Sequence, residues 1–130
     1  EFLAREKKAG RLQLALKPLP QKAAFLHGHC HQKAFGAMSA VQEAVALVPD
    51  LTVNLIESSC CGMAGSFGYE AEHYEISKKM GELDLLPAVR KAHAEALLVA
   101  DGTSCRHQIA DGSERRALHV ARVLERALVA

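Results

Sequence analysis

Three short apolar runs, separated by longer stretches with helical spacing, constrain the fold of this chain more than any other feature. The runs are 23–26 (AAFL), 51–56 (LTVNLI) and 96–100 (ALLVA), and a polar or glycine-containing turn follows each of them. Short, continuously apolar runs are typical of interior strands in a parallel sheet. The sequence therefore predicts an α/β domain of Rossmann-like, three-layer form, with a mostly parallel sheet of about four strands flanked by helices.

The stretches between and after these runs have the spacing of amphipathic helices. A proline can open a helix at its first position, and an acidic pair three residues apart resembles a capping box. The expected helices run from Phe35 to Val48, from Tyr69 to Met80 with Gly81 as the stop, from Pro87 to Ala92, and from a capping box at Asp111 and Glu114 through Leu118 and Leu124 to Leu128.

Length and composition indicate one globular domain. The chain has 130 residues, of which 49% are hydrophobic and 24% charged, and its formal net charge is +1. Basic residues are interspersed with acidic ones, so no nucleic-acid partner is expected. No apolar run approaches the roughly 20 residues of a membrane span, and a cytoplasmic location is expected. Because the sequence opens at Glu1 without a methionine, we expect residues 1–130 to be an excised domain.

All four cysteines follow the apolar runs: Cys30, Cys60, Cys61 and Cys105. Without secretory features, such cysteines favour a metal or redox site over a disulfide framework. The carboxyl ends of parallel strands meet at one edge of the sheet, where ligands bind. We therefore expect these four side chains to converge as metal ligands, with sulfur separations of roughly 4 to 8 Å.

The segment ESSCCGMAGSFGYE contains glycine at every third position, at Gly62, Gly65 and Gly68. Glycine permits a positive φ and close approach of the backbone to a bound group, so these three residues are expected to lie against the cofactor. The spacing is not the dinucleotide fingerprint. A disulfide between the adjacent Cys60 and Cys61 would be strained, which favours two thiolates on one metal centre. The alternative is a glycine-rich turn with two buried thiols.

Three histidines near the cysteines are additional ligand candidates: His29, His31 and His107. In an extended segment His29 and His31 would point away from Cys30, so structural hydrogen bonding is the favoured alternative for each of them. Four thiolates suit either a [4Fe-4S] cluster or tetrahedral zinc. The four cysteines are therefore also compatible with the alternative of a zinc-stabilised structural or docking domain that has no redox role. A cysteine-nucleophile enzyme would leave the adjacent pair unexplained.

The segments HGHCHQKA, CCGMAGSFGYE, LLPAVR and DGTSCRHQI resemble successive motifs of the cysteine-rich CCG domain of iron-sulfur oxidoreductases. The similarity extends from Phe2 to Leu128 and is strongest to the C-terminal part of FAD-linked oxidases of the D-lactate and D-2-hydroxyglutarate dehydrogenase kind. The domain's pattern of Cys, Cys-Cys-Gly and Cys-x-x-Cys maps onto Cys30, Cys60 to Gly62, and a final pair ending at Cys105. Gly102 stands where that pair begins. This departure argues against the double-cubane-like cluster of heterodisulfide reductase.

The resemblance implies an iron-sulfur electron-transfer domain within a larger, FAD-linked 2-hydroxy-acid oxidoreductase. Electrons would pass from FAD, bound in another domain, toward a quinone or another acceptor. The implied partners are the flavin domain and a further iron-sulfur domain of the same or a partner chain, and peripheral association with the inner membrane is compatible with this role. Because residues 1–130 carry no flavin-binding signature, we expect no dehydrogenase activity from them alone.

Overall fold

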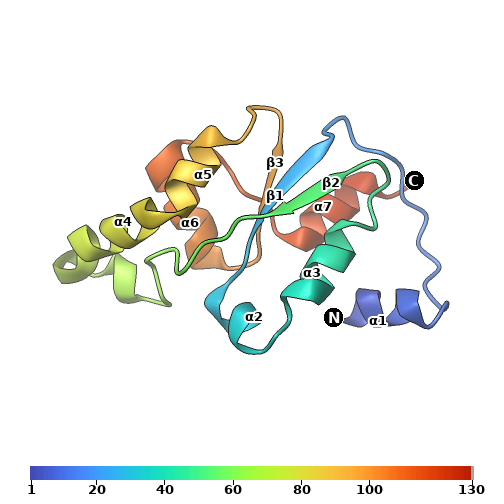
Figure 1. Cartoon of the computed structure of the whole chain (residues 1–130), viewed down its shortest axis with the longest axis horizontal. Coiled ribbons are helices and arrows are strands. Elements are labelled where there is room, and N and C mark those ends of the chain that lie inside the picture. The colour runs from blue at the N-terminus through green and yellow to red at the C-terminus, as the bar shows by residue number, and fades with distance from the viewer. Residues whose placement is uncertain (130) are drawn as a thin grey trace.

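A parallel sheet with helices on both faces forms the centre of the molecule (Figure 1). The computed structural model describes residues 1–129. Its strands are β1 (Ala23–His27), β2 (Thr52–Leu55) and β3 (Leu97–Ala100). Its α-helices are α1 (Phe2–Lys8), α2 (Cys30–Ala34), α3 (Met38–Val45), α4 (Tyr74–Leu83), α5 (Leu85–Lys91), α6 (Thr103–Ser113) and α7 (Val120–Ala127), with 3-10 turns η1 (Phe67–Tyr69) and η2 (Ala71–His73) before α4. The predicted three-layer α/β class is confirmed.

The sheet has the strand order β2-β1-β3, and both strand pairs are parallel. The sequence predicts about four strands, whereas three form among residues 1–129. Beyond β3, Leu118 makes a single parallel bridge to Val99. The Leu118 amide donates to Leu98 O at 2.8 Å, and the Ala100 amide donates to Leu118 O at 2.9 Å. At the place of a fourth strand, only Leu118 pairs with the sheet.

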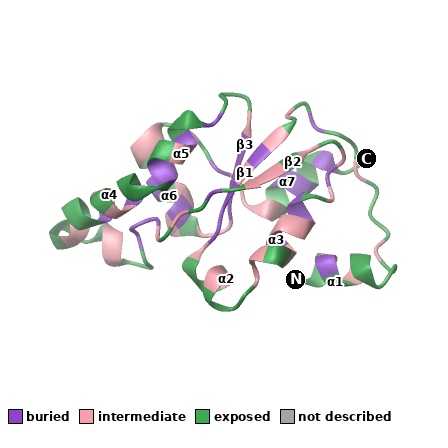
Figure 2. Ribbon diagram, in the orientation of Figure 1, coloured by how far each residue is buried: buried purple, intermediate pink, exposed green. Residues whose placement is uncertain are grey.

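Side-chain alternation along β1 and β3 divides the interior into two cores. Ala24 and Leu26 face one side of the sheet, where α3 and α7 cover them, and we call this the α3/α7 core. Phe25 and Leu98 face the other side, with α5 and α6, and we call this the α5/α6 core. Buried positions run through β1 and β3 and the inward sides of these helices, whereas β2 has no buried residue (Figure 2). Successive strand residues point to opposite faces, so each residue of β1 is assigned to one core.

The first two expected helices differ from the structure. The helix expected from Phe35 is divided, because Gly36 adopts φ +64° between α2 and α3. Phe35 is consequently 83% exposed and does not share the buried face of Val41 and Val45. The second expected helix does not stop at Gly81, which is buried inside α4.

The capping box predicted at Asp111 and Glu114 is wrong. Asp111 lies within α6, and Glu114 ends that helix with a left-handed backbone, φ 58°. The last helix begins later, where Nδ1 of His119 accepts a hydrogen bond from the Ala121 amide at 3.0 Å. Pro87 lies in the first turn of α5, which starts two residues earlier, at Leu85. Across the described part of the chain, no helix is long and apolar enough to cross a membrane.

Candidate metal centre

The carboxyl edge of the sheet brings the four cysteines into one region. Cys30 is the first residue of α2, directly after β1, and Cys105 lies in the first turn of α6, after β3. Cys60 and Cys61 lie in the loop that leaves β2. Cys61 and Cys105 are buried, Cys60 is half-buried and Cys30 is exposed, and all four are free thiols. Each cysteine thus follows a strand, as expected, and the role of all four as metal ligands remains a prediction.

His27, Cys61 and Cys105 form the tightest group at this edge. One ring nitrogen of His27 and the two sulfur atoms all lie within 4.8 Å of one another. His27 is 1% exposed, and the two cysteines are 2% exposed each. Soft thiolate and imidazole donors at such separations match the ligands of zinc and of iron-sulfur centres. We call this group the inner site.

The two buried thiols of the inner site have opposite protonation behaviour. A hydrogen bond with Cys105 is the largest of the contacts that lower the pKa of Cys61 to about 4; His27 and the Met63 amide contribute to the same shift, and burial opposes it. The same contact with Cys61, together with burial, raises the pKa of Cys105 far above its usual range. In the metal-free chain Cys61 is therefore the thiolate and Cys105 the thiol that donates to it.

Backbone amides of the loop after β2 also point at sulfur. The Met63 amide donates to Cys61 Sγ at 3.4 Å, and the Gly62 amide donates to Cys60 Sγ at 3.3 Å. Hydrogen bonds to a thiolate stabilise its charged form, and such bonds tune the potential of sulfur-ligated metal clusters. The bend after the adjacent cysteines thus provides a polar environment for both sulfur atoms.

Cys30 and Cys60 form a second, more accessible pair, which we call the outer pair. Burial, followed by the contact with Cys60, raises the pKa of Cys30, while the charge of Lys33 opposes the rise. The Lys33 ammonium also donates to the carbonyl oxygen of Ser58 and, at 2.8 Å, to that of Ser59. We call residues 56–73, which connect β2 to α4, the cysteine loop. Lys33 therefore connects this loop to α2 next to the outer pair.

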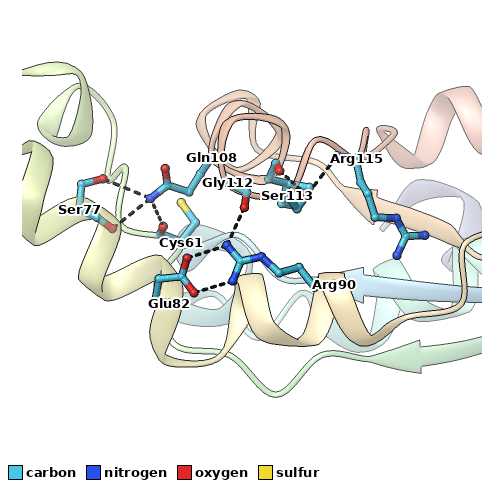
Figure 3. A network of polar contacts seen from close by, with 9 residues as sticks. Cys61, Ser77, Glu82, Arg90, Gln108, Gly112, Ser113 and Arg115 are labelled. Atoms are coloured by element: carbon cyan, nitrogen blue, oxygen red, sulfur yellow. Dashed lines mark hydrogen bonds and ion pairs between the residues drawn. The ribbon is translucent and has the colours of Figure 1, made fainter.

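Gln108 joins the inner site to the surrounding helices (Figure 3). Its buried amide nitrogen donates to Cys61 O at 2.9 Å and to Ser77 O at 3.0 Å. These bonds connect α6, the cysteine loop and α4 at one point. They fix the backbone of Cys61, whose carbonyl would otherwise lie buried without a donor.

The glycines of the cysteine loop allow it to pack tightly against α4. Gly62 has φ +94°, and a Cβ atom at this residue would overlap with Ser77 O. A Cβ at Gly68 would overlap with Met63 Sδ and lie 2.6 Å from Ser77 Oγ, whereas Gly65, with φ +65°, faces open space. Contact between these three glycines and a bound cofactor remains a prediction.

The additional histidine candidates lie near the cysteines but make other contacts. His29 caps α2 by accepting a hydrogen bond from the His31 amide at 3.1 Å, and His31 itself is exposed. His107 Nδ1 lies 2.5 Å from the Tyr69 hydroxyl. That these three histidines bind a metal remains a prediction.

Gly102, where the resembling domains begin their final cysteine pair, borders the inner site. A Cβ atom at Gly102 would lie 2.8 Å from Cys105 Sγ and would overlap with the ring of His29. The imidazole of His29 thus occupies the space that a side chain at position 102 would need.

His27 is the site residue that sequence reasoning did not assign. Its signal is the strand alternation: His27 follows Phe25 by two positions on β1, so both side chains point toward the α5/α6 core. Cys61 and Cys105 belong to that core. The opposite residue, Leu26, packs in the α3/α7 core. Sequence alternation alone would therefore have placed His27 on the side of Phe25, if the strand had been predicted to extend to residue 27.

Among the known proteins that this chain resembles are two dehydrogenases and a subunit of a third. The chain is 33% identical over 115 residues to one subunit of the anaerobic glycerol-3-phosphate dehydrogenase of Escherichia coli K12, covering 88% of this chain and 28% of the relative. It is 31% identical over 100 residues to D-2-hydroxyglutarate dehydrogenase of Pseudomonas putida, covering 76% of this chain and 10% of the relative. For D-2-hydroxyglutarate dehydrogenase of E. coli K12 the identity is 31% over 86 residues, covering 65% of this chain and 8% of the relative.

The chain therefore spans between 8% and 28% of the length of these relatives. No protein-family model matches the chain, and no solved structure matches it.

Proposed function

We propose that this chain is the metal-binding, electron-transferring domain of an FAD-linked oxidoreductase that acts on a 2-hydroxy acid. The observation that carries the proposal is the inner site, where His27, Cys61 and Cys105 place soft donors within 4.8 Å of one another. The similarity to oxidoreductases over most of this chain supports it. A [4Fe-4S] cluster is the proposed cofactor.

The donor set fits such a group. Cys61 and Cys105 provide buried sulfur ligands, Cys60 is the neighbour of Cys61 along the chain, and Cys30 lies across from Cys60. A bound iron-sulfur cluster supplies one-electron transfer. The residues of this chain would hold it, exclude water on the α5/α6 side, and donate amide hydrogen bonds from Gly62 and Met63 to its sulfur ligands.

The proposed electron path begins at FAD in another domain of a longer protein and ends at a quinone or another acceptor. The exposed side of Cys30 is the part of the site nearest to solvent, where a partner domain can approach. Flavin and iron-sulfur domains of the same or a partner chain are the proposed partners, and the proposed location is the cytoplasm, with peripheral association at the inner membrane.

A zinc-stabilised structural or docking domain is the second candidate. Its supporting observation is the same inner site, because a buried group of one imidazole and two thiols also suits tetrahedral zinc. A structural zinc ion would have no part in electron transfer.

Stopped-flow kinetics of the longer oxidoreductase tests the electron-transfer role. With Cys61→Ser, we expect flavin reduction by the 2-hydroxy acid to keep its wild-type rate and electron transfer to the final acceptor to be impaired. The reason is that hydride removal belongs to the flavin, whereas the substitution removes a sulfur ligand. If flavin reduction itself collapses while flavin stays bound, the proposed relay is wrong. Equal rates of both steps in the variant and the wild type would also contradict it.

A further inference from the structure

One ring nitrogen of His27 is buried without a hydrogen-bond partner. Nδ1 of His27 lies 2.6 Å from Ser58 Oγ, which leaves Nε2 without a hydrogen bond among the described residues. The other such buried atom in this part of the chain, Nδ1 of His73, lies 2.9 Å from the Glu70 carboxylate. A buried polar atom without a partner costs free energy, so the orphaned Nε2 indicates a missing ligand.

The neighbours of that nitrogen are sulfur atoms. The His27 ring nitrogen and the sulfur atoms of Cys61 and Cys105 fit within 4.8 Å. From this geometry we infer that Nε2 of His27 is a ligand of the metal centre, together with Cys61 and Cys105. The inference rests on the proposed function, and it gives the centre a mixed nitrogen and sulfur ligand set.

Ser58 has the position of a residue that orients this ligand. In the metal-bound chain Nδ1 would carry the proton and donate it to the Ser58 hydroxyl, so that Nε2 would present its lone pair to the metal. Metal-bound histidines commonly donate their second ring N–H to a fixed acceptor. Ser58 is fixed in turn, because its amide donates to Ile56 O at 2.9 Å and its carbonyl accepts from Lys33.

The geometry at His29 and His107 differs from that at His27. His29 uses Nδ1 to cap α2, and His107 Nδ1 pairs with the Tyr69 hydroxyl. Neither belongs to the group of donors within 4.8 Å. The nitrogen ligand therefore comes from the end of β1 rather than from the histidines next to Cys30 and Cys105.

NMR of the whole chain with 15N-labelled histidine tests this ligand, and Zn²⁺ alone is the probe because it is diamagnetic. On Zn²⁺ addition under reducing conditions, we expect the Nε2 resonance of His27 to move to the position of a metal-bound ring nitrogen, with the ring proton on Nδ1. His27→Asn should remove this resonance and weaken Zn²⁺ binding at least about tenfold. His93→Asn is the matched control, since His93 is an exposed histidine between α5 and β3, and it should change neither.

Each outcome decides the inference. Stoichiometric Zn²⁺ binding with an unchanged His27 Nε2 resonance overturns ligation by His27 and leaves the proposed metal centre standing. Failure of the wild-type chain to bind Zn²⁺ overturns the inference, and if iron is also absent from the anaerobically purified chain, the proposed function falls with it. If His27→Asn does not fold, the resonance is assigned through bonds in the wild-type chain, and its response to Zn²⁺ still decides.

Discussion

Gly62 is the residue at which the conformation of the cysteine loop is most tightly constrained. Its φ of +94° is unfavourable for residues with a side chain, and a Cβ atom there would overlap with a backbone oxygen of α4. We predict that Gly62→Ala lowers the free energy of unfolding by about 1–3 kcal/mol, because backbone strain and overpacking act together. Urea denaturation of the metal-free chain measures this loss.

Gly65→Ala is the matched control for Gly62→Ala. Gly65 also has a positive φ, +65°, but no atom lies within 4 Å of a Cβ built there. The variant should therefore lose less stability than Gly62→Ala. Equal losses in the two variants would show that contact with α4 is not what requires glycine at position 62.

The protonation of Cys105 should make the affinity for a metal ion fall as the pH is lowered. The pKa of Cys105 is raised, chiefly by the contact with Cys61, so the thiol keeps its proton at neutral pH, and a metal must displace that proton. The lowered pKa of Cys61 means that this residue releases no proton over the same range. Apparent Zn²⁺ affinity should therefore fall at least about tenfold for each unit that pH is lowered between about pH 8 and pH 7.

Competition titrations with a chelator of known affinity at several pH values measure this slope. An affinity that does not change with pH over that interval would contradict Cys105 as a protonated ligand. Cys105→Ser should bind the metal more weakly and with a smaller slope, since serine has no thiol proton to release.

At the scale of elements, Gln108 couples helix packing to the inner site. Its amide connects α6 with Cys61 O and with Ser77 O of α4. Gln108→Leu leaves the buried Cys61 carbonyl without a donor and removes the bond to Ser77 O, and we predict a loss of about 1–3 kcal/mol in the free energy of unfolding. Zn²⁺ affinity should also fall, because the backbone at Cys61 is no longer held. Thermal unfolding and chelator competition measure the two effects.

Arg90→Gln provides the matched control for Gln108→Leu. Arg90 also connects α4, α5 and α6, through two 2.7 Å bonds to Glu82 and one to Gly112 O (Figure 3). These groups are exposed and do not contact Cys61. Stability should fall little, since surface ion pairs contribute about 0–1 kcal/mol, and metal affinity should stay at the wild-type value. Equal losses of metal affinity in both variants would contradict the positioning role of Gln108.

The elements show which parts of the fold could be predicted from the sequence. The strands and the cysteines at their ends were predictable, because continuous apolar runs ending in polar turns determine both. The buried face of α4 was not, since it consists of Ser77 and Gly81, whose burial depends on the tertiary contact with Gln108. The start of α7 was missed because a histidine caps it, instead of the acidic pair that the pattern favoured.

For the molecule as a whole, we predict a domain that binds metal but does not oxidise substrate. Residues 1–130 should show no 2-hydroxy-acid dehydrogenase activity, with or without added FAD, because removal of hydride requires a bound organic cofactor. An assay with an artificial electron acceptor checks this, and the longer oxidoreductase is the positive control. Turnover by the chain alone would place the active site within these residues.

The site as a whole was predicted in part. The meeting of Cys61 and Cys105 follows from strand order, because parallel strands end at one edge. His27 was missed, since its side-chain direction depends on where β1 ends, which sequence patterns locate poorly. The opposite pKa shifts of the two buried thiols depend on side-chain distances that only the folded chain has.

The metal content of the chain, purified without oxygen as wild type and as Cys61→Ser, tests the central claim most directly. We predict a brown wild-type protein with stoichiometric iron and sulfide, and a colourless Cys61→Ser protein that has lost the metal. The circular dichroism of the two should be nearly equal, because two hydrophobic cores support the fold without a metal. A colourless wild-type protein with stoichiometric zinc would favour the structural alternative. A wild-type protein without metal, or a Cys61→Ser variant that keeps all of it, would contradict the claim that this edge of the sheet is a metal centre.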